Sequence, residues 1–274
     1  MTVNVHRAFI ACVLLACSTA AHGQWLNYPS PGIPRLPDGK PNLAAPTPKS
    51  ADGKPDLAGV WTKVASNQLD YFYDLAKDLP PDAVVMTPWA KAIAQQREAR
   101  RHVDDPFGYC MPPGVPRINV TPPTAIKILQ TPAVTALLYD LDTGPTFRQV
   151  HTDGRPLPTN PEPTWLGYSI GHWEGDVFVV ETSGFRDRGW IDTNTARPHS
   201  DALRVTERIR RLDVGRLEMV ITIDDPKAFV KPWTVTVPFR LLADSDLLEG
   251  SCEGHDRTLE HRRIDPPPLE PPSR

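Results

Sequence analysis

The segment TWLGYSIGHWEGDVFVVET, residues 164–182, decides the fold that we expect for this chain. Two stretches rich in β-branched and aromatic residues flank Glu174-Gly175-Asp176, a sequence typical of a tight hairpin turn. On the second stretch Val177 and Val179 share a face with Glu181, because side chains alternate along a strand. A buried carboxylate without a partner is costly. The hairpin therefore predicts a polar site on an otherwise apolar face.

The sequence after Thr124 predicts strands almost throughout. Hairpin signals such as Asp213-Val214-Gly215 and Asp244-Ser245-Asp246 separate many of them. The expected strands are AIKILQ, VTALLYD, TFRQVHTD, TWLGYSIGHW, DVFVVET, LRVTERIRRL, RLEMVITID, WTVTVPFRLL and LLEGSCEG. This pattern predicts an all-β antiparallel meander barrel of about 8–10 strands, with room inside for side chains or one small ligand.

The chain is expected to hold one folded domain, residues 51–256. Proline is abundant, with 32 residues, and a Pro-rich extended leader at 24–50 and a charged, Pro-rich tail at 257–274 flank the domain. One helix is predicted over residues 88–102, with Thr87 as its N-cap. Its apolar stripe predicts that it packs on the outside of the sheet.

Residues 1–23 have the features of an export signal. Arg7 precedes a short apolar run over residues 8–16, and Ala21-His22-Gly23 fits a cleavage site. A lipoprotein reading, with attachment through Cys17, competes with soluble export. The sequence has no other segment of membrane-spanning length, so we expect a periplasmic or extracellular protein without a transmembrane segment in its mature chain.

Cysteine usage agrees with export. After cleavage only Cys110 and Cys252 remain, and two cysteines in an oxidising compartment favour one disulfide bond. That bond would tie the Pro-rich middle loop to the last expected strand. The alternative is two unpaired buried thiols, since spacing alone does not fix disulfide geometry.

The opening strand carries a family resemblance. Gly59-Val60-Trp61 resembles the Gly-x-Trp start of lipocalin-like barrels, and the meander after it is similar in layout. The longer blocks DGKPDLAGVW, FRQVHTDGRPLP, GHWEGDVFVVET and TIDDPKAFVKPWT resemble exported soil-bacterial proteins of unknown function. The lipocalin-like resemblance implies binding of a small, largely apolar molecule, with some enzymes among such folds. It assigns no catalytic residue.

Strand alternation predicts an interior polar site. Apolar faces run along residues 217–223 and 233–241, and they are expected to line one interior. The polar residues expected to project into it are Gln149, His151, Glu181 and Glu207. A histidine beside two carboxylates can act as general acid and base, so His151, Glu181 and Glu207 are the candidate catalytic residues.

The competing interpretation is a structural ion pair. An interior arginine could neutralise each carboxylate without any catalysis. The nearby arginines, Arg148, Arg204, Arg208 and Arg210, have the opposite alternation, so such a pair would need a β-bulge to shift the register.

A second set of candidates comes from loops, which often carry ligand contacts at a barrel mouth. These residues could offer hydrogen bonds or an aromatic surface for stacking. The candidate ligand-binding residues, in addition to Gln149, are Tyr168, His172, Asp187, Arg188, Trp190, His199 and Trp233. Each taken singly is as well explained by a loop hydrogen bond or by core packing.

Several other functions find no support in the sequence. Charge is balanced, with 30 basic and 33 acidic residues, so no nucleic-acid partner is expected. The mature chain has no HxH, HExxH or CxxC spacing, and His151, His172 and His199 could form a metal site only by converging in space. Phosphate-binding and nucleophilic-serine motifs are absent too. We therefore predict neither a metal nor a cofactor.

Three functional hypotheses remain from the sequence. The first is an exported barrel that binds a small, partly aromatic or apolar molecule in its interior. The second is a metal-independent acid/base lyase, isomerase or hydrolase on the same barrel. The third is an envelope protein that uses its Pro-rich ends to contact partners. The polarity of the interior separates the first two hypotheses.

Overall fold

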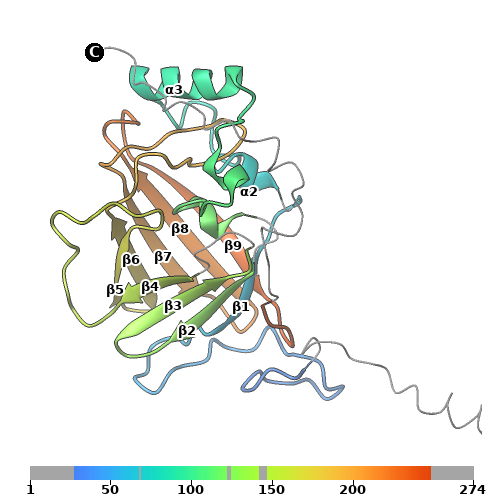
Figure 1. Cartoon of the computed structure of the whole chain (residues 1–274). Coiled ribbons are helices and arrows are strands. Elements are labelled where there is room, and N and C mark those ends of the chain that lie inside the picture. Colours follow the sequence, from blue (N-terminus) through green and yellow to red (C-terminus); the bar gives the residue numbers. More distant parts are fainter. Residues whose placement is uncertain (1–27, 68, 122–124, 142–146, 248–274) are drawn as a thin grey trace, which may run out of the picture.

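Nine strands close into one barrel within the part of the chain that the computed structural model describes, residues 28–67, 69–121, 125–141 and 147–247 (Figure 1). Each strand is bonded to its neighbours in sequence, and β1 pairs with both β2 and β9. The strands are β1 (Gly59–Lys63), β2 (Ile126–Gln130), β3 (Val134–Tyr139), β4 (Phe147–His151), β5 (Tyr168–Glu174), β6 (Val177–Ser183), β7 (Arg204–Arg211), β8 (Arg216–Asp224) and β9 (Trp233–Leu241). The expected all-β barrel is confirmed.

The pure antiparallel meander is wrong at one place. β4 and β5 are parallel, with Val150 opposite Ser169 and His151 opposite Ile170. A parallel pair needs a crossover, and residues 152–167 carry the chain back from the end of β4 to the start of β5. The expected hairpin of β5 and β6 is confirmed, with Gly175 in its turn at φ 61°. The ninth expected strand, LLEGSCEG, lies outside the described residues except for Leu247.

Apolar side chains on alternate positions fill the barrel. The faces expected on β8 and β9 are confirmed, since alternate residues from Leu217 to Ile223 and from Trp233 to Leu241 are all buried. Trp61 of β1 is also buried, and its indole Nε1 donates to the Leu57 carbonyl at 2.9 Å. Burial of each such side chain contributes roughly 1.5–3 kcal/mol, so these faces dominate the stability of the barrel.

Short helices cover one end of the barrel, which we call the helix-capped end (Figure 1). They are α2 (Asp70–Tyr73), α3 (Pro88–Ala99) and the 3₁₀ turns η1 (Pro106–Tyr109) and η2 (Arg117–Asn119), together with the loop 184–203. Thr87 caps α3 as expected, since its side chain accepts a bond from the Ala90 amide. The expected end at residue 102 and the expected packing outside the sheet are both wrong, because α3 stops at Ala99 and lies across the barrel end.

The buried face of α3 explains that position. Ala90, Ile93, Ala94 and Arg97 recur at helical spacing and are all buried. An arginine on this face brings a charge against the barrel end. Beyond α3 the chain turns at Arg101 and His102, which both have left-handed backbone conformations.

The described part of the leader, residues 28–50, and the segment 51–57 that follows it lie at the opposite end of the barrel (Figure 1). Their two DGKP copies form equivalent turns, with Asp38 accepting from the Lys40 amide and Asp52 from the Lys54 amide. The Gly215 amide donates to the Leu43 carbonyl at 2.8 Å, which fixes the leader to the β7–β8 turn. The leader thus closes this end, and small-molecule sites are better sought at the helix-capped end.

Candidate functional site

A charged pair lies inside the barrel and is fully enclosed. The side chains of Arg148 on β4 and Glu207 on β7 are 2% and 0% exposed. Arg148 Nη1 donates to Glu207 Oε1 at 3.0 Å, and Nη2 donates to Oε2. This bidentate geometry is the strong form of an arginine–carboxylate pair. The predicted interior position of Glu207 is confirmed.

Neighbouring side chains complete the hydrogen bonding of that pair. We call the whole group the interior cluster: Asn119, Tyr139, Arg148, Ser169, Thr182 and Glu207. Arg148 donates Nε to Ser169 Oγ at 2.9 Å and Nη2 to Thr182 Oγ1 at 2.6 Å. Asn119 Nδ2 donates to Glu207 Oε1 at 2.6 Å, and its oxygen accepts from the Tyr139 hydroxyl at 3.0 Å. The network is closed on itself, which is how a buried pair is retained.

Electrostatics fix the charges of the interior cluster. Burial on its own lowers the pKa of Arg148, but the facing Glu207 carboxylate outweighs it and leaves that pKa above its usual value. Burial also raises the pKa of Tyr139, so its hydroxyl stays protonated. A fixed arginine, a bonded carboxylate and a neutral tyrosine form a structural ion pair, which is the competing interpretation of the sequence.

The rest of the expected interior site is wrong. Gln149 and Glu181 are exposed and His151 is partly exposed, because Arg148 and Val150 are the inward residues of β4 and Phe178, Val180 and Thr182 those of β6. His151 and Glu181 lie in one lateral row on the outer face, with Ile170 between them. Two strand spacings separate them by about 10 Å. The structure therefore does not bring His151, Glu181 and Glu207 together.

The expected mouth residues fall into three sets: buried at the helix-capped end, exposed in a loop, and on the barrel wall. Trp190, His199 and Trp233 are buried at the helix-capped end. Asp187 and Arg188 are exposed in the loop that leads to Trp190. The other two lie on the wall: the Tyr168 hydroxyl donates to the Glu162 carbonyl, and His172 faces Glu174 near the β5–β6 turn. His172 is thus remote from His199 along the barrel axis.

A second polar group lies around Arg97, and we call it the cap cluster: Arg97, His102, Asp104, Arg117 and Trp190. The Arg97 guanidinium lies over the indole of Trp190, 4.5 Å from its centroid. The His102 ring meets the same indole edge-on, with 5.7 Å between centroids. Arg117 forms an ion pair with Asp105 at 2.6 Å. Arg97 and His102 thus both contact the indole of Trp190, and the Arg117–Asp105 pair is a separate contact of the cluster.

Several polar atoms of the cap cluster make no hydrogen bond to any described residue. They are Arg97 Nε, His102 Nε2, Arg117 Nε and both carboxylate oxygens of Asp104, and all of them are buried. Buried polar atoms in folded proteins are nearly always bonded, so each exception needs an explanation. The interior cluster has no atom of this kind among the described residues.

Arg97 keeps its charge in this setting. Burial lowers its pKa to about 10, while the charges of Asp104 and Asp105 raise it. The guanidinium Nη1 donates to the Ala196 carbonyl at 3.2 Å. No ion pair within 4.0 Å joins Arg97 to Asp104 among the described residues, although their charges interact. The cap cluster therefore holds opposite charges that are near each other but unpaired.

His199 lies beside the cap cluster. Gly189 lets its ring approach the backbone, since a Cβ at Gly189 would meet His199 Nε2 at 2.0 Å. Its Nδ1 lies 3.1 Å from the Ser200 carbonyl, and burial lowers its pKa. His199 is therefore held as a neutral ring in a fixed orientation.

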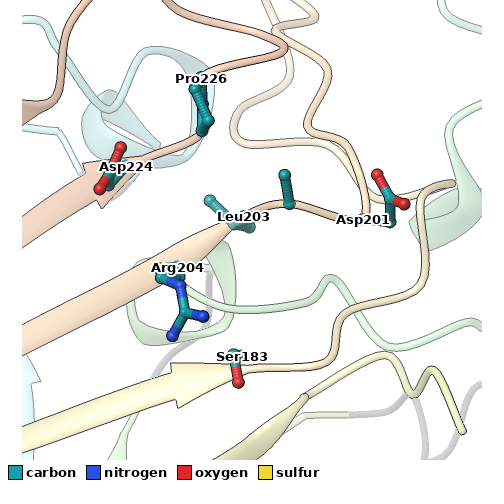
Figure 2. Close-up of a pocket in the computed structure, with 7 residues that line it drawn as sticks. Ser183, Asp201, Leu203, Arg204, Asp224 and Pro226 are labelled. Carbon is teal, nitrogen blue, oxygen red and sulfur yellow. The ribbon is translucent and has the colours of Figure 1, made fainter. Parts of the chain in front are cut away.

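A rim pocket opens where β6, β7 and β8 reach the helix-capped end (Figure 2). It has a volume of about 310 Å³ and is lined by Ser183, Asp201, Ala202, Leu203, Arg204, Asp224 and Pro226. This volume is at the small end for a ligand site. None of its lining residues has a buried unpartnered polar atom. The rim pocket is a rival position for a ligand, and it offers matched control residues.

Most residues of both clusters were not among the candidate site residues predicted from the sequence. The burial of Arg97 could have been predicted, because Arg97 continues the helical spacing of Ala90, Ile93 and Ala94. The burial of Arg148 could have been predicted from its alternation with Val150. His102, Asp104 and Arg117 had no such signal, since they lie in turns whose arrangement depends on the rest of the fold.

Comparisons with protein-family models, with curated proteins and with solved structures find no match for this chain. The closed barrel is consistent with a lipocalin-like layout, and the kinship itself stays a prediction. Within the described ranges no group of three or more histidine, cysteine, aspartate or glutamate side chains could hold a metal, and no helix there is long and apolar enough to cross a membrane.

The predicted Cys110–Cys252 bond is not tested, because Cys252 lies outside the described residues. The expected export signal, the lipid attachment at Cys17 and the tail also lie outside them.

Proposed function

We propose that this protein is an exported, lipocalin-like barrel that binds a small molecule at its helix-capped end. The observation that carries the proposal is the set of buried, unpartnered polar atoms of the cap cluster. Isolated buried polar groups cost about 1–3 kcal/mol each, so a protein retains several of them together where a partner repays the cost. A ligand that hydrogen-bonds these atoms is such a partner.

The position of the cap cluster supports this proposal. In the turn after α3, Arg101 and Val103 are exposed while His102 and Asp104 are partly buried. The cap cluster therefore lies one side-chain layer below the surface. Consecutive left-handed residues at Arg101 and His102 are unusual for residues other than glycine, and such conformations gather at ligand clamps.

The interior is a less favourable place for the ligand. The Arg148–Glu207 pair is enclosed and bonded on all sides, and apolar side chains occupy the faces of β8 and β9. Acid/base catalysis by His151, Glu181 and Glu207 draws no support from any described contact. The proposal therefore moves the ligand from the barrel interior to the helix-capped end.

Ligand-observed NMR on the signal-free chain tests this function. The probe panel holds glycerol, D-glucose, acetate, ethylammonium, alanine and indole, so that neutral, charged and aromatic classes are all present. We expect saturable binding of at least one class to the wild type and at least a tenfold loss in Arg97→Leu, a change of about 1.4 kcal/mol. Arg204→Leu in the rim pocket is the matched control and should bind as the wild type does.

Two outcomes would contradict the proposal. The first is that no probe of any class binds the wild type. The second is that binding survives Arg97→Leu but is lost in Arg204→Leu, which would assign the ligand to the rim pocket. Thermal melting of each variant by circular dichroism shows whether it is folded. If Arg97→Leu does not fold, His102→Leu takes its place.

A further inference from the structure

The free atoms of the cap cluster restrict the chemistry of a ligand. Arg97 Nε and Arg117 Nε are N–H donors, whereas the two Asp104 oxygens are acceptors. His102 Nε2 can do either, according to its tautomer. A ligand that satisfies these groups must both accept and donate hydrogen bonds.

Charge narrows the choice further. Arg117 is already paired with Asp105, and Arg197 pairs with Asp74 and Asp192 beside it. Within the cap cluster, Arg97 and Asp104 form no salt bridge to any described residue, and their charges have opposite signs. An anion drawn to Arg97 would meet Asp104, and a cation drawn to Asp104 would meet Arg97. An added charge would also lose its hydration on burial.

A hydroxyl group meets these demands without adding charge. Its oxygen accepts from an arginine N–H while its hydrogen is donated to a carboxylate. Bonds to charged partners contribute more than bonds between neutral groups, so each hydroxyl gains from both ends. A molecule with two or more hydroxyls can offer such bonds to more than one of these groups.

Trp190 holds this arrangement in place. The Arg97 guanidinium rests on the indole and its Nη1 is bonded to Ala196, so the direction of its Nε is fixed. Arg117 is fixed in a similar way by Asp105 and by the ring of Phe72, 4.7 Å away. Donors fixed before binding reduce the entropy that a ligand would otherwise lose in ordering them.

We infer that the cap cluster binds a small, neutral, hydroxylated molecule of the polyol or monosaccharide class. This inference rests on the proposed binding function and names the class of its ligand. Arg97 and Arg117 donate to ligand oxygens, and Asp104 accepts from ligand hydroxyls. The buried position of Arg97 and Trp190 favours a small member of the class.

Two Asp104 variants test the class, with glycerol and D-glucose as neutral probes and ethylammonium and acetate as charged ones. Asp104→Asn keeps an acceptor oxygen but loses the charge, so it should retain neutral-probe binding within about tenfold of the wild type. Asp104→Leu removes both acceptors and should lose more than tenfold. Asp224→Asn in the rim pocket is the control and should leave binding unchanged.

The outcomes separate this inference from the proposed function. Preferential binding of ethylammonium or acetate, lost in Arg97→Leu or Asp104→Leu, would overturn the neutral class and leave binding at the helix-capped end intact. Binding of glycerol or D-glucose that Asp104→Leu does not weaken would also overturn it. If no probe binds at all, the proposed function fails as well. The intrinsic fluorescence of Trp190, read as the difference between the wild type and Trp190→Phe, gives a second measure of each binding event.

Discussion

The interior cluster and the cap cluster contain the same kinds of groups in opposite states. In the interior cluster Arg148 and Glu207 are bonded to each other and to three further side chains, and Tyr139 is bonded to one of these, Asn119. In the cap cluster Arg97 and Asp104 are both charged and close, yet Arg97 Nε and both Asp104 oxygens are unpartnered among the described residues. Closure of the first network suits a structural role, and the open state of the second suits a ligand.

A carboxylate on an otherwise apolar strand face does not, therefore, by itself mark a functional site. Glu207 is the most deeply buried candidate, and its bonds are all made within the protein. Asp104 sits in a turn with no pattern around it, and its bonds are not made. A decisive comparison changes both carboxylates to their amides.

The largest effect is expected for Glu207→Gln. The substitution keeps the size of the side chain but leaves the Arg148 charge buried without a counter-charge. Breaking a buried pair in this way costs about 3–5 kcal/mol. Urea unfolding should therefore show a large fall in the free energy of unfolding, with little change in ligand binding by the folded fraction.

Glu181→Gln is the control for that prediction. Glu181 is exposed on β6, the neighbour of β7 in the barrel, and its substitution should change stability by less than about 0.5 kcal/mol. Equal effects of the two variants would show that Glu207 is not buried in a pair. Loss of an activity in a fully stable Glu207→Gln protein would instead support the catalytic role.

The next largest effect concerns pH at the helix-capped end. Burial lowers the pKa of His199 in the folded protein, whereas the unfolded chain binds a proton near pH 6.5. Below that pH the unfolded state holds more protons, so the free energy of unfolding should fall as the pH drops from about 6.5 toward the folded-state pKa. Asp225 and Asp187 oppose this effect and Arg97 reinforces it.

Urea unfolding of the wild type and of His199→Asn at several pH values between 7 and 5 measures this contribution. The variant should show a flatter dependence on pH, whatever its absolute stability. His172→Asn removes an exposed imidazole remote from His199 and is measured alongside it as a control for the loss of a histidine. A His199→Asn slope as steep as that of the wild type would count against a buried neutral His199.

The fold was largely predictable because its signals are local. Most strands from β2 to β9 carry an alternation of apolar residues or a flanking turn signal, and Gly59-Val60-Trp61 correctly marks β1. The parallel β4–β5 pair was not predictable, since residues 152–167 form a loop whose path depends on where the other strands lie. Strand existence is a local property, whereas pairing is a property of the whole barrel.

The errors in the site have a similar physical cause. In β6 Phe178, Val179 and Val180 are all buried, so apolar character does not reveal which alternate set faces inward. In β4 the apolar residues Phe147 and Val150 have opposite alternation, and the structure buries Val150 and exposes Phe147. For these strands the sequence is compatible with either alternate set of side chains facing inward, and the closure of the barrel determines which set does. Arg148 thereby faces Glu207 without any bulge.

A small effect is expected for Asp104→Asn, the counterpart of the first prediction. Removing a buried charge without a hydrogen bond relieves a cost, while the loss of attraction to Arg97 works the other way. The free energy of unfolding should change by less than about 1 kcal/mol, well below the effect of Glu207→Gln. A loss as large as that of Glu207→Gln would mean that Asp104 is paired in the folded protein, which would contradict the open state of the cap cluster.

An effect of similar size is expected for Arg101→Gly. Arg101 has a φ of 54°, a conformation that costs a residue with a Cβ about 1–2 kcal/mol, and glycine adopts it freely. The more flexible unfolded chain offsets part of the gain, so we expect a net stabilisation of about 0.5–1 kcal/mol in urea unfolding. Ala99→Gly, two residues earlier and within α3, should have the opposite sign, since glycine is a poor helix former. Stabilisation by Arg101→Gly with unchanged probe binding would show that the turn is strained but not needed to hold Asp104. Stabilisation with weakened binding would show that this strain helps to hold His102 against Trp190.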